Sequence, residues 1–168
     1  MSVFASLAQE HALLLRVIAR LERGAADPDP RTADRETREA LSVLLNGLEQ
    51  HERLEHLVFD EAPEMSTAAG AQARELITQQ HGALDRLRAQ ARELLARPAE
   101  GDGVALRGAS TRLARMLRRH FLAEERQLWP RFNACAGRST LSRLSRTARE
   151  QLRVMTRELE RFWFSVGA

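Results

Sequence analysis

Hydrophobic residues recur at alternating steps of three and four along most of the 168-residue chain. This spacing places them on one face of an α-helix and is typical of helices that pack nearly parallel or antiparallel. The pattern breaks at stretches that contain proline or glycine, with Asp34 as the expected N-cap of the second helix. It predicts five helices over about residues 2–23, 34–62, 66–97, 102–132 and 139–166.

Each of the first four helices carries polar residues where its hydrophobic seam would otherwise hold leucine. In chain order these residues are His11, His51, Glu55, His81, His120 and Glu124. The second and fourth helices each place a glutamate four residues after a histidine, so both side chains share one helix face. Gln127 continues the seam of the fourth helix, whereas the fifth helix has no histidine.

Four helices with short connections predict an all-α fold. We expect an up-down-up-down antiparallel four-helix bundle over residues 1–135, with an additional C-terminal amphipathic helix over residues 136–168. Two positions for this fifth helix remain open. Packing along the bundle is favoured, and a homodimer interface is the alternative.

In such a bundle the four seam histidines can reach one layer near the middle, because each lies about nine to seventeen residues into its helix. The two seam glutamates would lie in the same layer, where buried carboxylates are unfavourable and repel each other. No arginine stands clearly in the seam beside them. Bound cations would compensate the carboxylates and accept the imidazoles, so the seam predicts a metal site.

The composition narrows the class of protein. Hydrophobic residues make up 43% and charged residues 29% of the chain, and the chain has no tyrosine. No apolar run is long enough for a membrane span and no signal peptide is recognisable, so we expect a cytoplasmic location and no membrane partner. Cys135 is the single cysteine and cannot form an internal disulfide. The basic residues are interspersed with acids and aromatic content is 5%, which argues against nucleic-acid binding.

The ordered set of motifs resembles the hemerythrin-like, HHE cation-binding domain family. The motifs are His11, His51-x-x-x-Glu55, His81 and His120-x-x-x-Glu124-Glu125-x-x-Leu128-Trp129-Pro130. The resemblance extends over about residues 3–133 and leaves out the fifth helix. It implies two non-haem iron ions with an oxo or hydroxo bridge, with Glu55 and Glu124 as bridging ligands and the four histidines as terminal ligands. Imidazole and carboxylate ligands without thiolate suit iron, with manganese or zinc as alternatives.

The chain departs from the family pattern at two positions. Oxygen-carrying members have a second histidine on the third helix, where this chain has Asp85, four residues after His81. Asp85 is either a further ligand or a solvated side chain. Where a glutamate is usual after Glu55, the chain has His56, which lies about 100° around the helix and is a surface or outer candidate, as is Glu52.

Counting ligands gives an expectation about reactivity. Two six-coordinate irons offer twelve positions, of which four histidines, two bridging carboxylates and one bridging oxygen fill ten. Two open positions favour reaction with O2, NO or peroxide over reversible oxygen carriage. The favoured function is a sensor of iron, O2 or NO. The alternatives are an oxidative or peroxide-decomposing enzyme and a simple iron- or zinc-holding module.

Overall fold

The chain is all-helical over the residues that the computed structural model describes, which are 2–60, 68–97 and 102–166, and these contain no strand. The helices are α1 (Val3–Ala25), α2 (Pro30–Asp60), α3 (Ala68–Ala96), α4 (Gly103–Ala123), the π-helical turn η2 (Glu124–Leu128), α5 (Trp129–Cys135) and α6 (Arg138–Val166). The prediction of an all-helical bundle is confirmed. The expected start of the third helix, near residue 66, lies outside the described residues.

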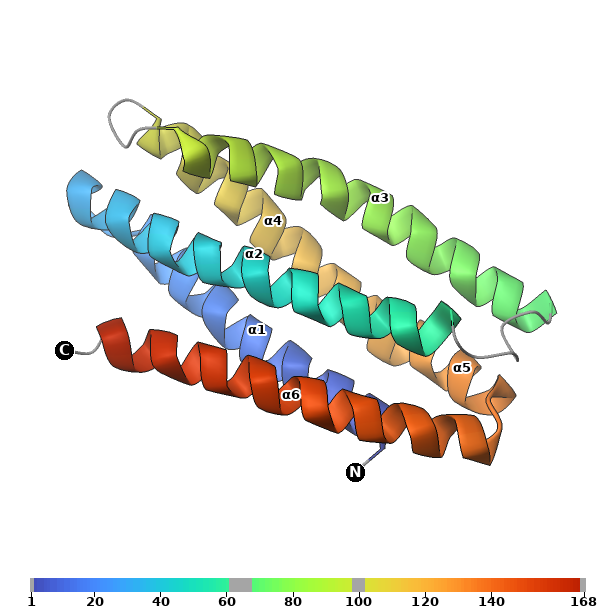
Figure 1. Ribbon diagram of the computed structural model, residues 1–168. Helices are drawn as coiled ribbons and strands as arrows, with labels where there is room; N and C mark the ends of the chain where they lie inside the picture. Colours follow the sequence, from blue (N-terminus) through green and yellow to red (C-terminus); the bar gives the residue numbers. More distant parts are fainter. Residues whose placement is uncertain (1, 61–67, 98–101, 167–168) are drawn as a thin grey trace.

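The long helices lie side by side, as Figure 1 shows. Helix α1 packs against α2 and α4, and α3 packs against α4 and α2. Helix α6, red in Figure 1, packs along α1 and α2. Its buried hydrophobic side chains are Leu144, Ala148, Leu152, Met155 and Leu159. Of the two positions expected for this helix, packing on the bundle is the one found within a single chain. A homodimer stays a prediction.

Two hydrophobic clusters fill the bundle, one on each side of the polar seam residues. On α1 the first cluster includes Leu14 and the second includes Leu7, with His11 between them. On α2 the corresponding residues are Leu48 and Leu54, which flank His51. The polar residues therefore form a layer inside the bundle, between two apolar regions.

Helix α2 begins four residues earlier than the sequence predicted. Pro30 opens the helix, where its missing N–H and fixed φ are tolerated. The Asp29 carboxylate accepts hydrogen bonds from the backbone N–H of Thr32 (2.9 Å) and from its hydroxyl (2.6 Å). These bonds hold the pKa of Asp29 below its usual value. The prediction of Asp34 as the N-cap is wrong, because Asp34 lies within the helix and pairs with Arg38 (2.9 Å).

The fourth predicted helix contains a π-helical turn, which the seam pattern did not predict. The turn η2 spans Glu124–Leu128, and the N–H of Trp129 donates to the carbonyl of Glu124. Pro130 follows, and its ring would clash with the carbonyl four residues earlier in a regular α-helix. A π-turn adds one residue, so Leu128 is buried and Gln127 is exposed. The prediction that Gln127 continues the seam is therefore wrong.

Candidate metal centre

The structure brings the six polar seam residues together in two groups that share Glu124. The inner group consists of His11, His51 and Glu124, and the outer group consists of Glu55, His81, His120 and Glu124. Within each group the potential ligand atoms all lie within 4.8 Å of one another, and every member is buried. The groups are contributed by α1, α2, α3, α4 and η2, so one layer of the bundle holds both.

The Nε2 atoms of the histidines point toward the carboxylates of Glu55 and Glu124. In the inner group the Nε2 of His11 lies 3.1 Å from Oε2 of Glu124, and the Nε2 of His51 lies 3.9 Å from the same oxygen. In the outer group the Nε2 of His120 lies 2.7 Å from Oε1 of Glu124. The Nε2 of His81 lies 3.4 Å from Oε2 of Glu55. The two oxygens of Glu124 thus face different groups.

The opposite ring nitrogen, Nδ1, is hydrogen-bonded in three of the histidines. His51 donates to the buried Glu10 (3.0 Å), His11 to Glu125 (2.8 Å) and His120 to Gln80 (2.9 Å). Such bonds fix the tautomer and leave the lone pair of Nε2 directed into the centre.

Sequence reasoning missed Glu10, Gln80 and Glu125 as partners of the histidines. A signal existed for Glu10, which stands three residues after Leu7 and four before Leu14, the spacing of a buried position. Gln80 is only half-buried and Glu125 is exposed, so no burial pattern distinguished them from ordinary surface residues.

The charged side chains of this layer change one another's pKa values. Burial alone would lower the pKa of His51, but the charge of Glu55 and the hydrogen bond to Glu10 raise it well above its usual value. Burial would raise the pKa of Glu124, yet the neighbouring imidazoles of His11, His120 and His51 hold it well below its usual value. Burial and the charge of Glu124 raise the pKa of Glu55. The centre concentrates negative charge that a cation would neutralise.

Several atoms of the centre are buried without a hydrogen-bond partner in the described structure. They are both carboxylate oxygens of Glu55, both of Glu124, and the Nε2 atoms of His81 and His120. Buried polar atoms are rarely left unpaired in native proteins, so such atoms need an explanation. Nitrogen and carboxylate oxygen atoms that converge in this way are suitable ligands for a transition-metal ion. The residues therefore fit a metal centre.

The three weaker candidates lie outside both groups. The Asp85 side chain is 66% exposed, and one of its oxygens lies 3.4 Å from Nη1 of Arg88. His56 is exposed, with its ring centroid 5.8 Å from that of His81. Glu52 forms an ion pair with Arg88, a buried arginine of the α3 seam. The expectation that no arginine stands beside the layer was wrong, although the ion pairs of Arg88 are with Glu52 and Asp85.

Aromatic side chains pack closely on the inner group. Phe121 stacks on the His11 ring with the centroids 4.1 Å apart, and Trp129 stacks on it at 4.9 Å. Trp129 follows η2 directly, so the extra residue of the π-turn contributes to its inward position. These rings restrict the orientation of His11.

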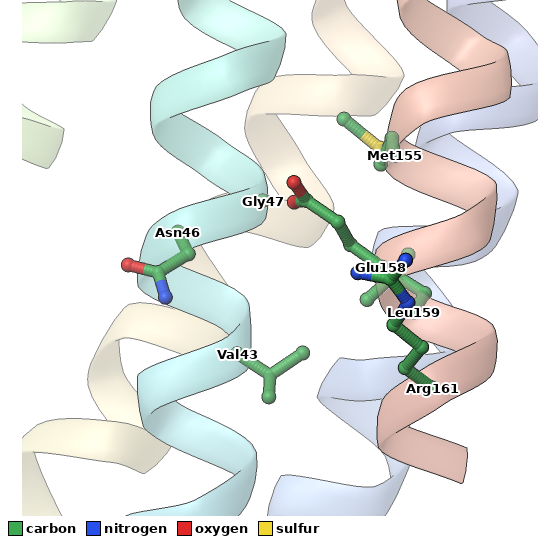
Figure 2. Close-up of a pocket in the computed structure, with 7 residues that line it drawn as sticks. All are labelled: Val43, Asn46, Gly47, Met155, Glu158, Leu159 and Arg161. Atoms are coloured by element: carbon green, nitrogen blue, oxygen red, sulfur yellow. The ribbon is translucent and has the colours of Figure 1, made fainter. Parts of the chain in front are cut away.

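A groove of about 330 Å³ lies between α2 and α6 (Figure 2). Val43, Gly47, Met155 and Leu159 contribute to its wall, and the Glu158 side chain extends across it. None of the six residues of the centre lines this groove, so it is a separate feature.

Among the described helices none has the length and apolar character of a membrane span. The cytoplasmic location stays a prediction.

Comparison with known proteins gives one family. The sequence model described as "Hemerythrin HHE cation binding domain" matches residues 72–165, more than half of the chain. No curated protein and no solved structure matches. The match includes most of α6, so the expectation that the resemblance stops before the fifth helix is wrong.

The match leaves out α1 and α2, yet these helices repeat the arrangement of α3 and α4. His11 and His51 are 40 residues apart, and His81 and His120 are 39 residues apart. In both pairs of helices a glutamate follows the second histidine by four residues.

Proposed function

Because the chain belongs to the hemerythrin HHE cation-binding family, we propose that it binds two non-haem iron ions, one in the inner and one in the outer group. Glu124 supports this most directly, since its two oxygens face different groups and neither has a hydrogen-bond partner among the described residues. In the proposed site, the carboxylates of Glu55 and Glu124 and the imidazoles of the four histidines would hold the ions. The four helices that carry them form an up-down-up-down bundle.

The residues around the ligands have defined parts in this proposal. Hydrogen bonds at Nδ1 direct the Nε2 lone pairs of His11, His51 and His120 toward the ions. The two hydrophobic clusters exclude water from both ends of the layer, which strengthens the attraction between carboxylates and cations. Nitrogen and oxygen ligands without thiolate favour iron, with manganese or zinc as alternatives.

We propose that the protein senses or reacts with O2, NO, peroxide or iron. Bound iron would supply the redox chemistry, and the protein would control access to it. Asp85 pairs with Arg88 and His56 is exposed, which supports a centre with four histidines and two open coordination positions. The side chain of His81 is 11% exposed, against 1% for His11, which supports access of a small ligand from the outer group.

The absorption spectrum of the iron-loaded protein tests this function. We expect two irons per chain and the bands of a bridged ferric pair under air, which disappear reversibly on reduction. Zinc in place of iron, or iron without these bands, would instead indicate a metal-holding module. Steady-state peroxide disproportionation by the iron-loaded protein would indicate the enzyme alternative.

A further inference from the structure

The inner and outer groups differ in the side chains that stand behind their histidines. Carboxylates accept the Nδ1 hydrogen bonds of both inner histidines, from Glu10 to His51 and from Glu125 to His11. In the outer group a neutral amide, Gln80, accepts the Nδ1 hydrogen bond of His120. A carboxylate and an amide both fix the tautomer, but only the carboxylate adds negative charge and raises the basicity of the imidazole.

Glu10 is the most unusual of these partners. It is 0% exposed, lies between Leu7 and Leu14 on the buried face of α1, and its Oε1 has no hydrogen-bond partner in the described structure. Burying a carboxylate in such a place is unfavourable unless a positive charge lies nearby. The side chain that Glu10 contacts, His51, is itself a member of the inner group. A cation bound by the inner group would place a positive charge on the far side of the His51 imidazole that Glu10 contacts.

We propose that Glu10 is a positioning residue and that Glu125 assists it. Glu10 strengthens metal binding in the inner group and not in the outer group. The inference rests on the proposed function, because it requires an ion in each group. The two ions would then bind with different affinities, and the cause would be residues that hydrogen-bond to the ligands and do not contact the ions themselves. Replacing the carboxylate by an amide should weaken one of two binding steps and leave the other unchanged.

Stepwise titration with cobalt(II), in competition with a chelator, tests this inference on the full chain. In the wild type we expect two ions with separate dissociation constants. Glu10→Gln keeps the shape of the side chain and its hydrogen-bond acceptor. It should raise one of the two dissociation constants by about 10- to 100-fold. Glu125→Gln should raise the same constant by less, since the Glu125 side chain is 41% exposed. Gln80→Leu is the matched control and should raise the other constant.

Two further measurements separate positioning from a general structural role. In a His51→Ala background, where Glu10 has lost its partner, Glu10→Gln should cause no further change in cobalt(II) affinity. Glu10→Gln should lower the unfolding temperature more in the cobalt(II)-loaded protein than in the metal-free protein, because the amide weakens metal binding as well as the pairing with His51. A purely structural carboxylate would lower both unfolding temperatures equally. Glu125→Gln changes an exposed position and provides the test if Glu10→Gln fails to fold.

The inference is overturned if Glu10→Gln or Glu125→Gln changes neither constant, changes both equally, or affects the same constant as Gln80→Leu. It is also overturned if the effect of Glu10→Gln persists in the His51→Ala background. A wild-type protein that binds fewer than two cobalt(II) ions would contradict the proposed function itself, and the inference with it.

Discussion

Glu124 is the residue on which both groups of the centre depend. Its Oε2 lies 3.1 Å from His11 and its Oε1 lies 2.7 Å from His120, so one carboxylate connects α1 with α4. Three neighbouring imidazoles hold its pKa well below the usual value despite burial. An ionised carboxylate of this kind is suited to bind two cations at once.

We predict that Glu124→Ala loses both ions, whereas His120→Ala loses the outer ion and keeps the inner one. The physical reason is that Glu124 belongs to both groups and His120 to one. Metal content after loading and dialysis measures the difference. Full iron occupancy in both variants would contradict the ligand assignment.

At the scale of residues, the sequence predicted the six residues that the structure brings together better than it predicted the side chains around them. The six polar seam positions were predictable because each replaces a hydrophobic residue in a regular helical pattern. Gln80 and Glu125 were not, because whether a surface side chain reaches a histidine depends on how two helices are rotated against each other. Asp85 shows the same limit, since only the structure reveals its contact with Arg88.

At the scale of elements, the start of α2 depends on Asp29. We predict that Asp29→Ala lowers the melting temperature at pH 7, because the N–H of Thr32 loses its acceptor. Asp29→Asn is the matched control and should retain most of the stability, since asparagine also caps helices.

The stabilisation by Asp29 should also depend on pH. The pKa of Asp29 is lowered in the folded protein from the ordinary value of 3.8, so folding favours the ionised form. The advantage of aspartate over alanine is therefore complete above pH 3.8 and is lost as the pH falls through the lowered pKa. Thermal melts of both proteins between pH 7 and acid measure this. A difference that is independent of pH would show that the ionised carboxylate is not the cap.

The close packing of α1 on α2 depends on a small residue at Gly24. A Cβ atom there would lie 2.8 Å from the Cβ of Glu36 and 3.3 Å from its carbonyl carbon. We predict that Gly24→Ala destabilises the fold by about 1–3 kcal/mol, although alanine favours helices. Gly108→Ala is the control, because its nearest neighbour would be 3.6 Å away, and it should stabilise by about 0.5–1 kcal/mol. Chemical denaturation measures both, and equal effects would argue against close packing at Gly24.

The helix boundaries show where a periodic pattern stops being informative. Alternating steps of three and four predicted α4 correctly as far as Glu124 and then failed at Gln127. The π-turn shifts every later residue around the helix axis, and Pro130 is the sequence feature that indicates this shift. A proline inside an otherwise regular helix thus indicates that the register of the buried positions changes near it.

At the scale of the molecule, the candidate metal centre lies between the two hydrophobic clusters. Without a cation, the fold has to bury the carboxylates of Glu10, Glu55 and Glu124 among histidines. Metal binding is then coupled to the stability of the whole bundle, because the unfolded chain does not preserve the site.

We predict that removing the metal with a chelator lowers the melting temperature by roughly 5–10 °C for each ion lost. An ion present at about 100 times its dissociation constant contributes about 2.7 kcal/mol, and about 2–4 °C corresponds to each kcal/mol in a chain of this length. Calorimetry of the loaded and chelated protein, followed by reloading, measures the effect. An unchanged melting temperature would contradict coupling between the site and the fold.

The helical fold was predictable because the hydrophobic period is regular in every long helix. Packing of α6 on the bundle was the favoured expectation and is the position found, although an apolar stripe such as Leu144 to Leu159 also suits a dimer. The family match from residue 72 to 165 could not be anticipated from the motifs, half of which lie before it.

The central claim is that the six residues hold two metal ions with Glu124 between them. Anomalous diffraction at the iron edge from crystals of the iron-loaded protein tests it most directly. We expect two iron peaks, one beside His11 and His51 and one beside His81 and His120, with Glu55 and Glu124 between them and no ligation by Asp85. A single peak, or no peak in this layer, would contradict the proposal.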